Sequence, residues 1–287
     1  MKETGARTLT ERLIMAHVIT HREFKLLLQA DGFPTKRSVI AFNDELAKIA
    51  TKLGVHYEAF DALDCGIRQV RFFDTRDQLF RKNNVILRIR RDQSGGWPDE
   101  TWEVTFKRRS PDYQKAADFD VGCSLGLRER RKFKEEILRG EAVGSIRRIY
   151  SNNNVLDSPL EKFEAPMSRI AGIFRGLHDF GFDPEAMVAP VNAARVFEIQ
   201  ARLGLLNFGK DVMAHMDLAV WNRPTEDAFN VLIAELAFAY KVLGSTVKHQ
   251  EGHDAADAFF KELQSPLRDR LATGTTKTAL IYGVDEY

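Results

Sequence analysis

The chain has 287 residues, enough for one large domain or two of ordinary size. Its 42 lysines and arginines almost balance its 41 aspartates and glutamates, which leaves a net charge of +1. This balance argues against a global field that would attract nucleic acid or an acidic lipid surface, so any selectivity for anions must be local. We therefore expect neither nucleic acid nor a membrane as a partner. The oligomeric state stays open.

Cysteine usage and hydropathy indicate the compartment. Cys65 and Cys123 are too few for a disulfide framework and wrongly spaced for a zinc site. No stretch approaches the ~20 apolar residues of a membrane span, and no signal peptide is evident. We predict a cytoplasmic protein in a reducing compartment. Residues 1–17 are predicted to form a helical lead-in, and residues 18–287 a single domain, because no long Gly/Ser/Pro linker divides them.

The first half alternates between strand and helix signals. Residues 18–28 place His21, Glu23 and Lys25 at every second position, which predicts a strand with three titratable groups on one face. A helix is predicted to start with Asn43 as its cap and to stop at Gly54. Further strands are predicted over 69–74, 82–91 and 101–109, with a hairpin loop at the Gly-Gly and Pro of residues 94–100.

The second half is less regular. Residues 109–126 read as a loop. Residues 128–138 are ambiguous, since their i,i+4 charge pairs and propensity favour a helix, whereas their alternation also fits a charged strand. A helical segment is expected around 167–177, followed by the segments 196–203, 213–221, 227–241 and 265–287. We find no internal repeat.

Two arginines stand at alternate positions in an apolar strand. Arg88 and Arg90 would lie opposite a strand that carries Glu103, Thr105 and Lys107. An unpaired buried charge costs several kcal/mol, so an anionic partner is expected. On one strand such charges commonly mark the solvated face of an antiparallel sheet. Several strands share the pattern here, however, which suits a closed barrel that binds a polyphosphate through arginine forks and its metal through carboxylates.

Four fragments resemble the CYTH or triphosphate tunnel metalloenzyme family. The family has an ExExK strand, a YFDT-like element, an LRIR strand and a W-x-x-T-x-K strand. This chain has HREFK (21–25), RFFDT (71–75), ILRIR (86–90) and WEVTFK (102–107), in the same order. The resemblance covers roughly residues 18–282. It implies an α+β fold, a closed eight-stranded antiparallel β-barrel that forms a tunnel, with helices packed outside.

The resemblance also implies roles for individual residues. The expected phosphate-binding residues are Lys25, Arg88, Arg90, Lys107, Arg195 and Lys277, with Lys25 and Lys107 as the catalytic cations. The expected ligands of Mg²⁺ or Mn²⁺ are Glu23, Glu135, Asp217 and Glu235. The family pattern would further make residues 128–138 a strand, against their propensity. Two acidic positions of that pattern are occupied by His21 and Ala237, so the acidic side of the tunnel departs from the family while the basic side matches it.

These residues predict a metal-dependent phosphohydrolase acting on inorganic triphosphate, a nucleoside triphosphate or thiamine triphosphate. His21 and Ala237 motivate one alternative, a catalytically weak module that binds polyphosphate or a nucleotide. A second alternative is an adenylate cyclase, an activity that the resembled family also contains.

Overall fold

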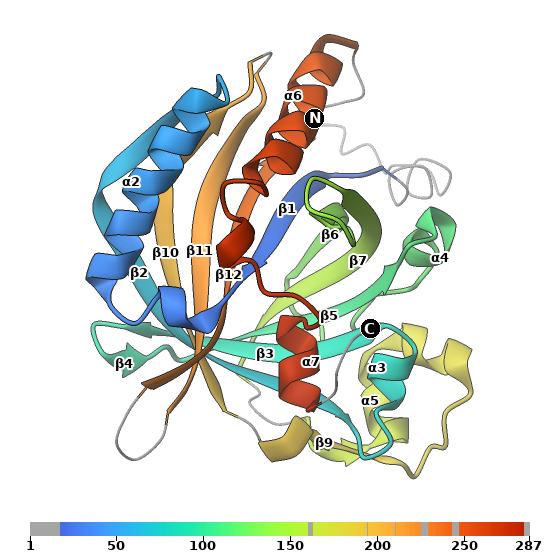
Figure 1. The fold of residues 1–287 in the computed structure, drawn as a ribbon. Coiled ribbons are helices and arrows are strands. Elements are labelled where there is room, and N and C mark those ends of the chain that lie inside the picture. The colour runs from blue at the N-terminus through green and yellow to red at the C-terminus, as the bar shows by residue number, and fades with distance from the viewer. Residues whose placement is uncertain are drawn as a thin grey trace, which may run out of the picture.

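A closed β-barrel stands at the centre of the computed structural model, with helices on its outside (Figure 1). The structure describes residues 18–159, 163–193, 195–209, 211–224, 229–242 and 247–283, so the predicted lead-in 1–17 lies outside it. The strands of the barrel are β1 (His21–Leu28), β2 (His56–Thr75), β3 (Val85–Ser94), β5 (Trp102–Ser110), β6 (Glu129–Arg139), β7 (Ile146–Ser158), β10 (Val196–Asn207), β11 (Met213–Pro224) and β12 (Phe229–Lys241).

Short strands and helices complete the described chain. The short strands are β4 (Trp97–Pro98), β8 (Ala165–Pro166) and β9 (Met187–Pro190). The α-helices are α2 (Lys36–Lys52), α3 (Leu79–Lys82), α4 (Tyr113–Ala117), α5 (Met167–Ile173), α6 (Val247–Leu263) and α7 (Lys277–Tyr282). The 3-10 helices are η1 (Ala30–Gly32), η2 (Arg175–Phe180), η3 (Val191–Ala193) and η4 (Arg268–Arg270). Among these ranges, no helix is both long and apolar enough to cross a membrane.

The order of strands around the barrel corrects the predicted topology. The strands follow the order β3-β5-β7-β6-β1-β12-β11-β10-β2, and pairing of β2 with β3 closes the ring. Neighbours are antiparallel except β1 and β6, which are parallel. Strand directions cannot alternate all the way around a ring of nine, so one pair of neighbours must be parallel. The prediction of eight antiparallel strands was wrong on both points, whereas the closed barrel with outer helices is confirmed.

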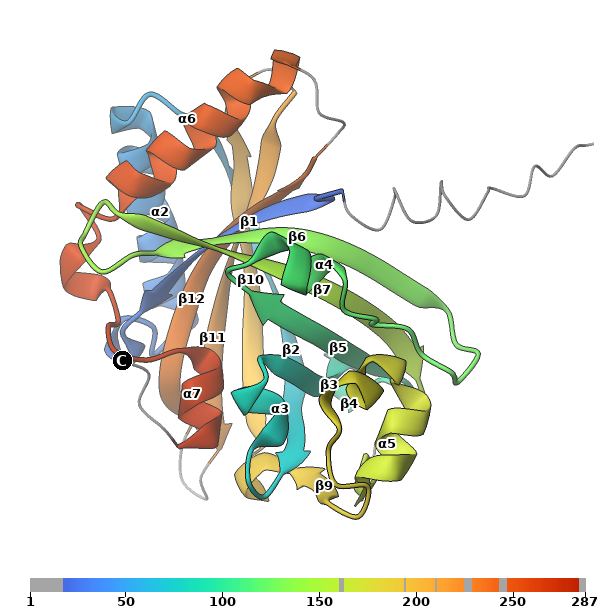
Figure 2. The same cartoon turned by 90° about the vertical axis from the view of Figure 1, so that its right-hand side faces the viewer.

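Two large hydrophobic clusters lie between the barrel wall and the helices. On β1, the outward residues Phe24, Leu26 and Leu28 are buried, while the alternate residues face the interior. Helices α2 and α6 cover this outer apolar surface of β1, β10, β11 and β12 (Figure 1). On the opposite side, α5 covers the outer face of β3 and β5 (Figure 2). Because the helices bury the outer face, the barrel interior is free to carry charged side chains.

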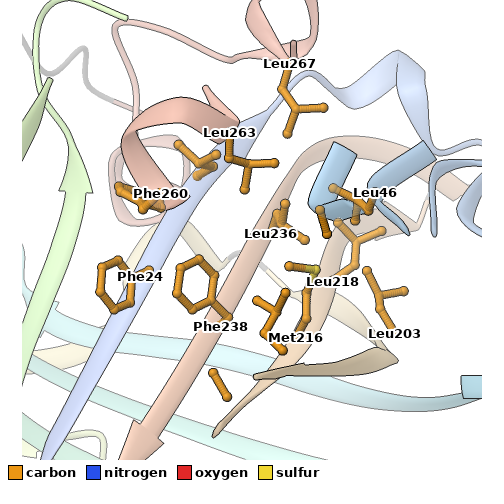
Figure 3. Close-up of a cluster of buried hydrophobic side chains, with 14 of the residues drawn as sticks. Phe24, Leu46, Leu203, Met216, Leu218, Leu236, Phe238, Phe260, Leu263 and Leu267 are labelled. Atoms are coloured by element: carbon orange, nitrogen blue, oxygen red, sulfur yellow. The ribbon is translucent and has the colours of Figure 1, made fainter. Parts of the chain in front are cut away.

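A stacked aromatic group joins the barrel wall to its outer helix. The Phe24 ring stacks on Phe238 with their centres 4.4 Å apart, and lies 5.3 Å from Phe260 of α6. Leu236 and Leu263 fill the space beside these rings (Figure 3). This packing fixes β1, and with it the inward side chains on its other face.

Two local predictions fail for identifiable reasons. Helix α2 begins at Lys36, because Thr35 and Ser38 form a capping box upstream of the predicted cap. Asn43 lies inside the helix, where its side-chain amide donates to the carbonyl of Leu203 and its side-chain oxygen accepts from the Tyr57 hydroxyl. The helical interpretation of residues 128–138 is also wrong. This segment is strand β6, since pairing with β7 and β1 on its two sides outweighs helix propensity.

The FFDT fragment builds a turn. One carboxylate oxygen of Asp74 accepts from the backbone N–H groups of Thr75 and Phe80, and the other accepts from Arg81 N–H. The Tyr282 hydroxyl donates to that second oxygen at 2.9 Å. Asp74 therefore holds the start of α3 and ties the C-terminal helix α7 to the end of β2.

Candidate active site in the barrel interior

A cavity of about 640 Å³ occupies the barrel interior. The segment 272–276 and the start of α7 line one side of it. Its basic lining residues are Lys25, Arg88, Lys107, Arg109, Arg139, Arg147 and Lys277, and its acidic lining residues are Glu136, Glu141 and Glu235. Positive side chains therefore outnumber carboxylates, which makes the cavity an anion site by composition.

Lys25 lies between two carboxylates. Its Nζ is 3.0 Å from Glu23 Oε2 and 3.1 Å from Glu136 Oε2. Burial alone would lower the pKa of Lys25, but Glu136 and Glu23 outweigh it and raise this pKa above its ordinary value. The ammonium is therefore kept charged at the cavity wall.

Arg88 and Lys107 are cations of the inner wall that carboxylates neutralise only weakly. The Arg88 guanidinium donates to Thr105 Oγ1 at 3.2 Å, and it makes no ion pair with any carboxylate in the described part of the chain. Burial and the neighbouring Arg90 hold the pKa of Arg88 well below its ordinary value. Burial and Arg109 likewise hold the pKa of Lys107 well below its ordinary value. Among the described residues, the one carboxylate that pairs with Lys107 is Glu136, at 3.9 Å. An anion bound here would stabilise the charged forms of Arg88 and Lys107, which burial and the neighbouring cations destabilise.

The inward carboxylate of β6 is Glu136. It is 1% exposed, its Oε2 lies 2.9 Å from Arg109 Nη2, and its Oε1 lies 3.9 Å from Lys107 Nζ. Burial would raise the pKa of Glu136, but Arg109 and Lys25 hold it well below its ordinary value. The expectation that Glu135 faces inward was wrong.

Glu135 lies on the outside of the barrel. Its carboxylate is 2.6 Å from Arg22 Nε and 3.0 Å from Arg148 Nε. Successive side chains on a strand point to opposite faces, so the one-residue difference exchanges a tunnel group for an outer ion pair. Both glutamates lie in the charged segment 128–138, and its alternation alone does not say which of them faces inward. The pairing of β6 with β1 decides this, because it sets Glu136 beside the inward Glu23.

Glu198 is a central carboxylate that sequence reasoning missed. It is 0% exposed, accepts from Trp221 Nε1 at 2.5 Å, and pairs with Arg68. Arg90 Nη2 and Lys277 Nζ lie 3.9 and 3.7 Å from its Oε2. A signal was present, because Glu198 is the only acid within residues 196–207, a strand of mainly apolar residues.

The C-terminal segment contributes Lys277. Its Nζ is 2.7 Å from Glu235 Oε1 and 5.0 Å from the centre of the Trp221 ring. The structure thus brings Lys277 and Glu235, both named from the sequence, to the cavity wall. Arg90 lies beside the cavity lining and is 3.4 Å from Glu103.

Besides Glu23, Arg90 and Glu135, two further predicted residues do not line the cavity. Arg195 is exposed immediately before β10, and the inward position of that strand is taken by Glu198. Asp217 is half-buried on β11 opposite Arg202 and Ala237, and does not line the cavity. Burial raises the pKa of Asp217. Arg195 therefore does not take part in the predicted phosphate site in this structure. Asp217 lies outside the cavity lining but near enough to Glu23 for that carboxylate to raise its pKa further.

The acids of the interior set what metal could bind. Among the residues that the structure describes, no three His, Cys, Asp or Glu side chains form a group that could hold a metal ion. Glu23 and Glu136 are close enough to share Lys25. Mg²⁺ commonly takes one or two carboxylates and completes its shell with water and substrate phosphate oxygens. The donor set therefore fits a metal carried by a phosphate ligand, and not a cage made by the protein alone.

Comparisons with known proteins find similarity only at the level of structure. No family model and no curated protein matches the chain. A candidate adenylyl cyclase from Hippeastrum, HpAC1, which has a dominant triphosphatase activity, matches with a TM-score of 0.42, 13% identity, and 92% of this chain and 96% of that chain covered. A candidate adenylate cyclase from Bacillus halodurans matches with a TM-score of 0.37 and 11% identity over 91% and 97% of the two chains.

A third solved structure, the PH1819 protein from Pyrococcus horikoshii, matches with a TM-score of 0.31 and 12% identity. This match covers 86% of this chain and 99% of that chain.

Proposed function

We propose that the barrel cavity binds the triphosphate part of a substrate and that the protein hydrolyses its terminal phosphoryl group with the help of a divalent metal. The observation that carries this proposal is the pair of buried, poorly neutralised cations, Arg88 and Lys107, inside a cavity of about 640 Å³. Leaving two such charges unpaired is costly, and a polyanion is the ligand that offsets the cost.

Phosphoryl transfer asks little covalent chemistry of a protein. It requires that the phosphate chain be positioned and that charge on its equatorial oxygens be stabilised as water attacks in line. Arg88 and Arg109 supply guanidinium forks, and Lys25 and Lys107 supply point charges, from strands on several sides of the cavity. Lys277 approaches from the C-terminal segment. In this proposal Lys25 and Lys107 contact the reacting phosphoryl group.

Glu23 and Glu136 are the residues that would hold Mg²⁺ or Mn²⁺ beside the phosphates. The metal would supply further neutralisation of phosphate charge. His21 stands two residues before Glu23, and burial together with Lys132 and Lys134 lowers the pKa of His21 to about 4, so its imidazole is neutral near pH 7. A neutral imidazole accepts Mn²⁺ more readily than Mg²⁺.

The substrate class includes inorganic triphosphate, nucleoside triphosphates and thiamine triphosphate. We further propose that residues 18–287 act as one tunnel domain. A cytoplasmic setting is proposed with it, because Cys65 and Cys123 are both free thiols.

Release of orthophosphate from tripolyphosphate with Mg²⁺ or Mn²⁺ tests the proposal. The wild-type protein is expected to release phosphate, and Arg88→Gln to bind tripolyphosphate about 10- to 100-fold more weakly, the equivalent of losing one or two hydrogen bonds to a charged group. Because Arg88 makes no ion pair with the carboxylates that the structure describes, its replacement should not lower the melting temperature of the free protein.

A matched control lies on the same strand. Arg91 faces outward, with its guanidinium 5.2 Å from the centre of the Trp102 ring, so Arg91→Gln should retain binding and turnover. No phosphate release from any triphosphate with either metal would refute the hydrolase.

A second candidate function is favoured by one observation. The described residues contain no group of three metal-binding side chains, which suits a module that binds polyphosphate or nucleotide without turning it over. Thermal stabilisation by tripolyphosphate without product would identify such a module. Formation of cyclic AMP from ATP would instead identify a cyclase.

A further inference from the structure

A second cavity, of about 350 Å³, adjoins the first. The residues that line both are Ile86, Arg109, Leu138, Arg147, Thr276 and Thr278. The residues that line only the second include Arg81, Asn84, Ser110 and Tyr282. The shared residues place the two cavities side by side, within reach of one extended ligand.

The second cavity contains only one sign of charge. Its described lining includes three arginines and no Asp or Glu, whereas the first cavity mixes cations with three glutamates. Ser110, Thr276, Thr278 and Tyr282 add hydroxyl groups. Asp74, which accepts from Tyr282, has both oxygens occupied by hydrogen bonds that hold the turn at α3. The carboxylate of Asp74 therefore serves to hold this turn.

Two of these arginines have few hydrogen-bond or ion-pair partners among the described residues. The Nε of Arg81 is buried without a hydrogen-bond partner, and its guanidinium lies 5.9 Å from the centre of the Tyr282 ring. Within the described part of the chain, its side chain makes one hydrogen bond, a long one of 3.4 Å from Nη1 to Gln78 Oε1. Arg147 is exposed and makes no ion pair within the described ranges. These groups are available to an anion.

We propose that the second cavity extends the phosphate site, so that the preferred ligand is a linear polyphosphate longer than three phosphates. This inference rests on the proposed function. A nucleoside triphosphate is anionic at one end only, but here guanidinium groups line both cavities, with Arg109 and Arg147 at their junction. A chain with phosphates along its whole length satisfies the two sets of donors together.

Calorimetric titration without divalent metal, which avoids turnover, tests the inference with tripolyphosphate and a long-chain linear polyphosphate. We expect the long chain to bind wild type about tenfold more tightly, the scale of one charge-assisted hydrogen bond. Arg81→Gln should remove this advantage and leave the affinity for tripolyphosphate unchanged, because Arg81 lines only the second cavity.

Arg76→Gln is the matched control. Arg76 is exposed between β2 and α3 and lines neither cavity, so the variant loses the same charge without altering the proposed site. The extended site would be overturned by equal affinities of wild type for the two ligands, or by equal losses of affinity in Arg81→Gln and Arg76→Gln. In either case, binding of tripolyphosphate to wild type would still support the phosphate site of the proposed function. Failure of wild type to bind either ligand would overturn both.

Discussion

Lys107 illustrates how a buried cation can couple binding to pH. Its amine is surrounded by Arg109, Lys25 and Arg88, with Glu136 as the opposing charge. Burial and Arg109 hold its pKa well below the ordinary lysine value, so the unfolded chain binds more protons than the folded one in the pH range between these two values. The free energy of unfolding therefore rises with pH through that range and falls as the pH drops toward the folded-state pKa of Lys107.

A phosphate anion should reverse this depression of the pKa. We predict that tripolyphosphate binding takes up protons through Lys107 and weakens as the pH rises through the depressed pKa of Lys107. Lys107→Arg, which stays charged, should take up fewer protons than wild type, by up to about one per ligand. Calorimetry in two buffers of different ionisation enthalpy measures the uptake.

Lys241→Arg provides the control, because Lys241 is exposed at the end of β12 and lines neither cavity. The protons taken up by tripolyphosphate itself are common to all three proteins. Identical uptake by wild type and Lys107→Arg would contradict the assignment.

At the scale of the element, strand β6 carries two adjacent glutamates with different roles. Glu136 faces Lys25 and Arg109 in the cavity, and Glu135 faces Arg22 and Arg148 outside. Arg22 also pairs with Asp257 of α6, so the outer network ties the barrel wall to its covering helix. The strand therefore separates a ligand-binding face from a structural one.

Exchanging one carboxylate at a time tests this division. Glu135→Gln should lower the free energy of unfolding by about 2 kcal/mol, since it weakens a buried charged hydrogen bond, and should keep phosphate release. Glu136→Gln should abolish metal-dependent release while metal-free tripolyphosphate binding persists or strengthens, because a negative charge is removed beside the anion. Urea denaturation and phosphate-release assays give the two readouts. The reverse pattern would show that the faces are misassigned.

The two large hydrophobic clusters of the molecule lie outside the barrel. Phe24, Phe238 and Phe260 pack between the wall and α6, on the side of β1 opposite Lys25 (Figure 3). Most of this apolar packing lies on the outer face of the wall, while a smaller cluster with Phe72, Ile86 and Trp221 borders the charged cavity. Burial of the interior charges is a cost that this outer packing must exceed.

Phe24→Ala measures that packing. We predict a loss of about 3–5 kcal/mol in the free energy of unfolding, because Phe24 is 0% exposed and its removal leaves a cavity between two elements. Trp97→Ala is the comparison: Trp97 is 79% exposed, and its loss should cost no more than about 0.5 kcal/mol. Similar costs for the two variants in urea denaturation would contradict the placement of the core.

The sequence by itself determined which side chains share a face of each strand. Alternation grouped Arg88 with Arg90, and Glu23 with Lys25, and both groups lie at the barrel interior. This much is local, because successive residues of any strand point to opposite sides. Arg109, which follows Lys107 at the same period, could have been named by the same reasoning.

Only the tertiary structure decided which strands meet and which face becomes the inside. The choice of Glu136 over Glu135, the parallel pairing of β1 with β6, and the approach of Lys277 to Glu235 all depend on how the ring closes. Arg195 was predicted inward but precedes its strand, where no ladder orients the side chain. Closure is a property of strand pairings between distant segments, and a pattern read along one segment does not contain it.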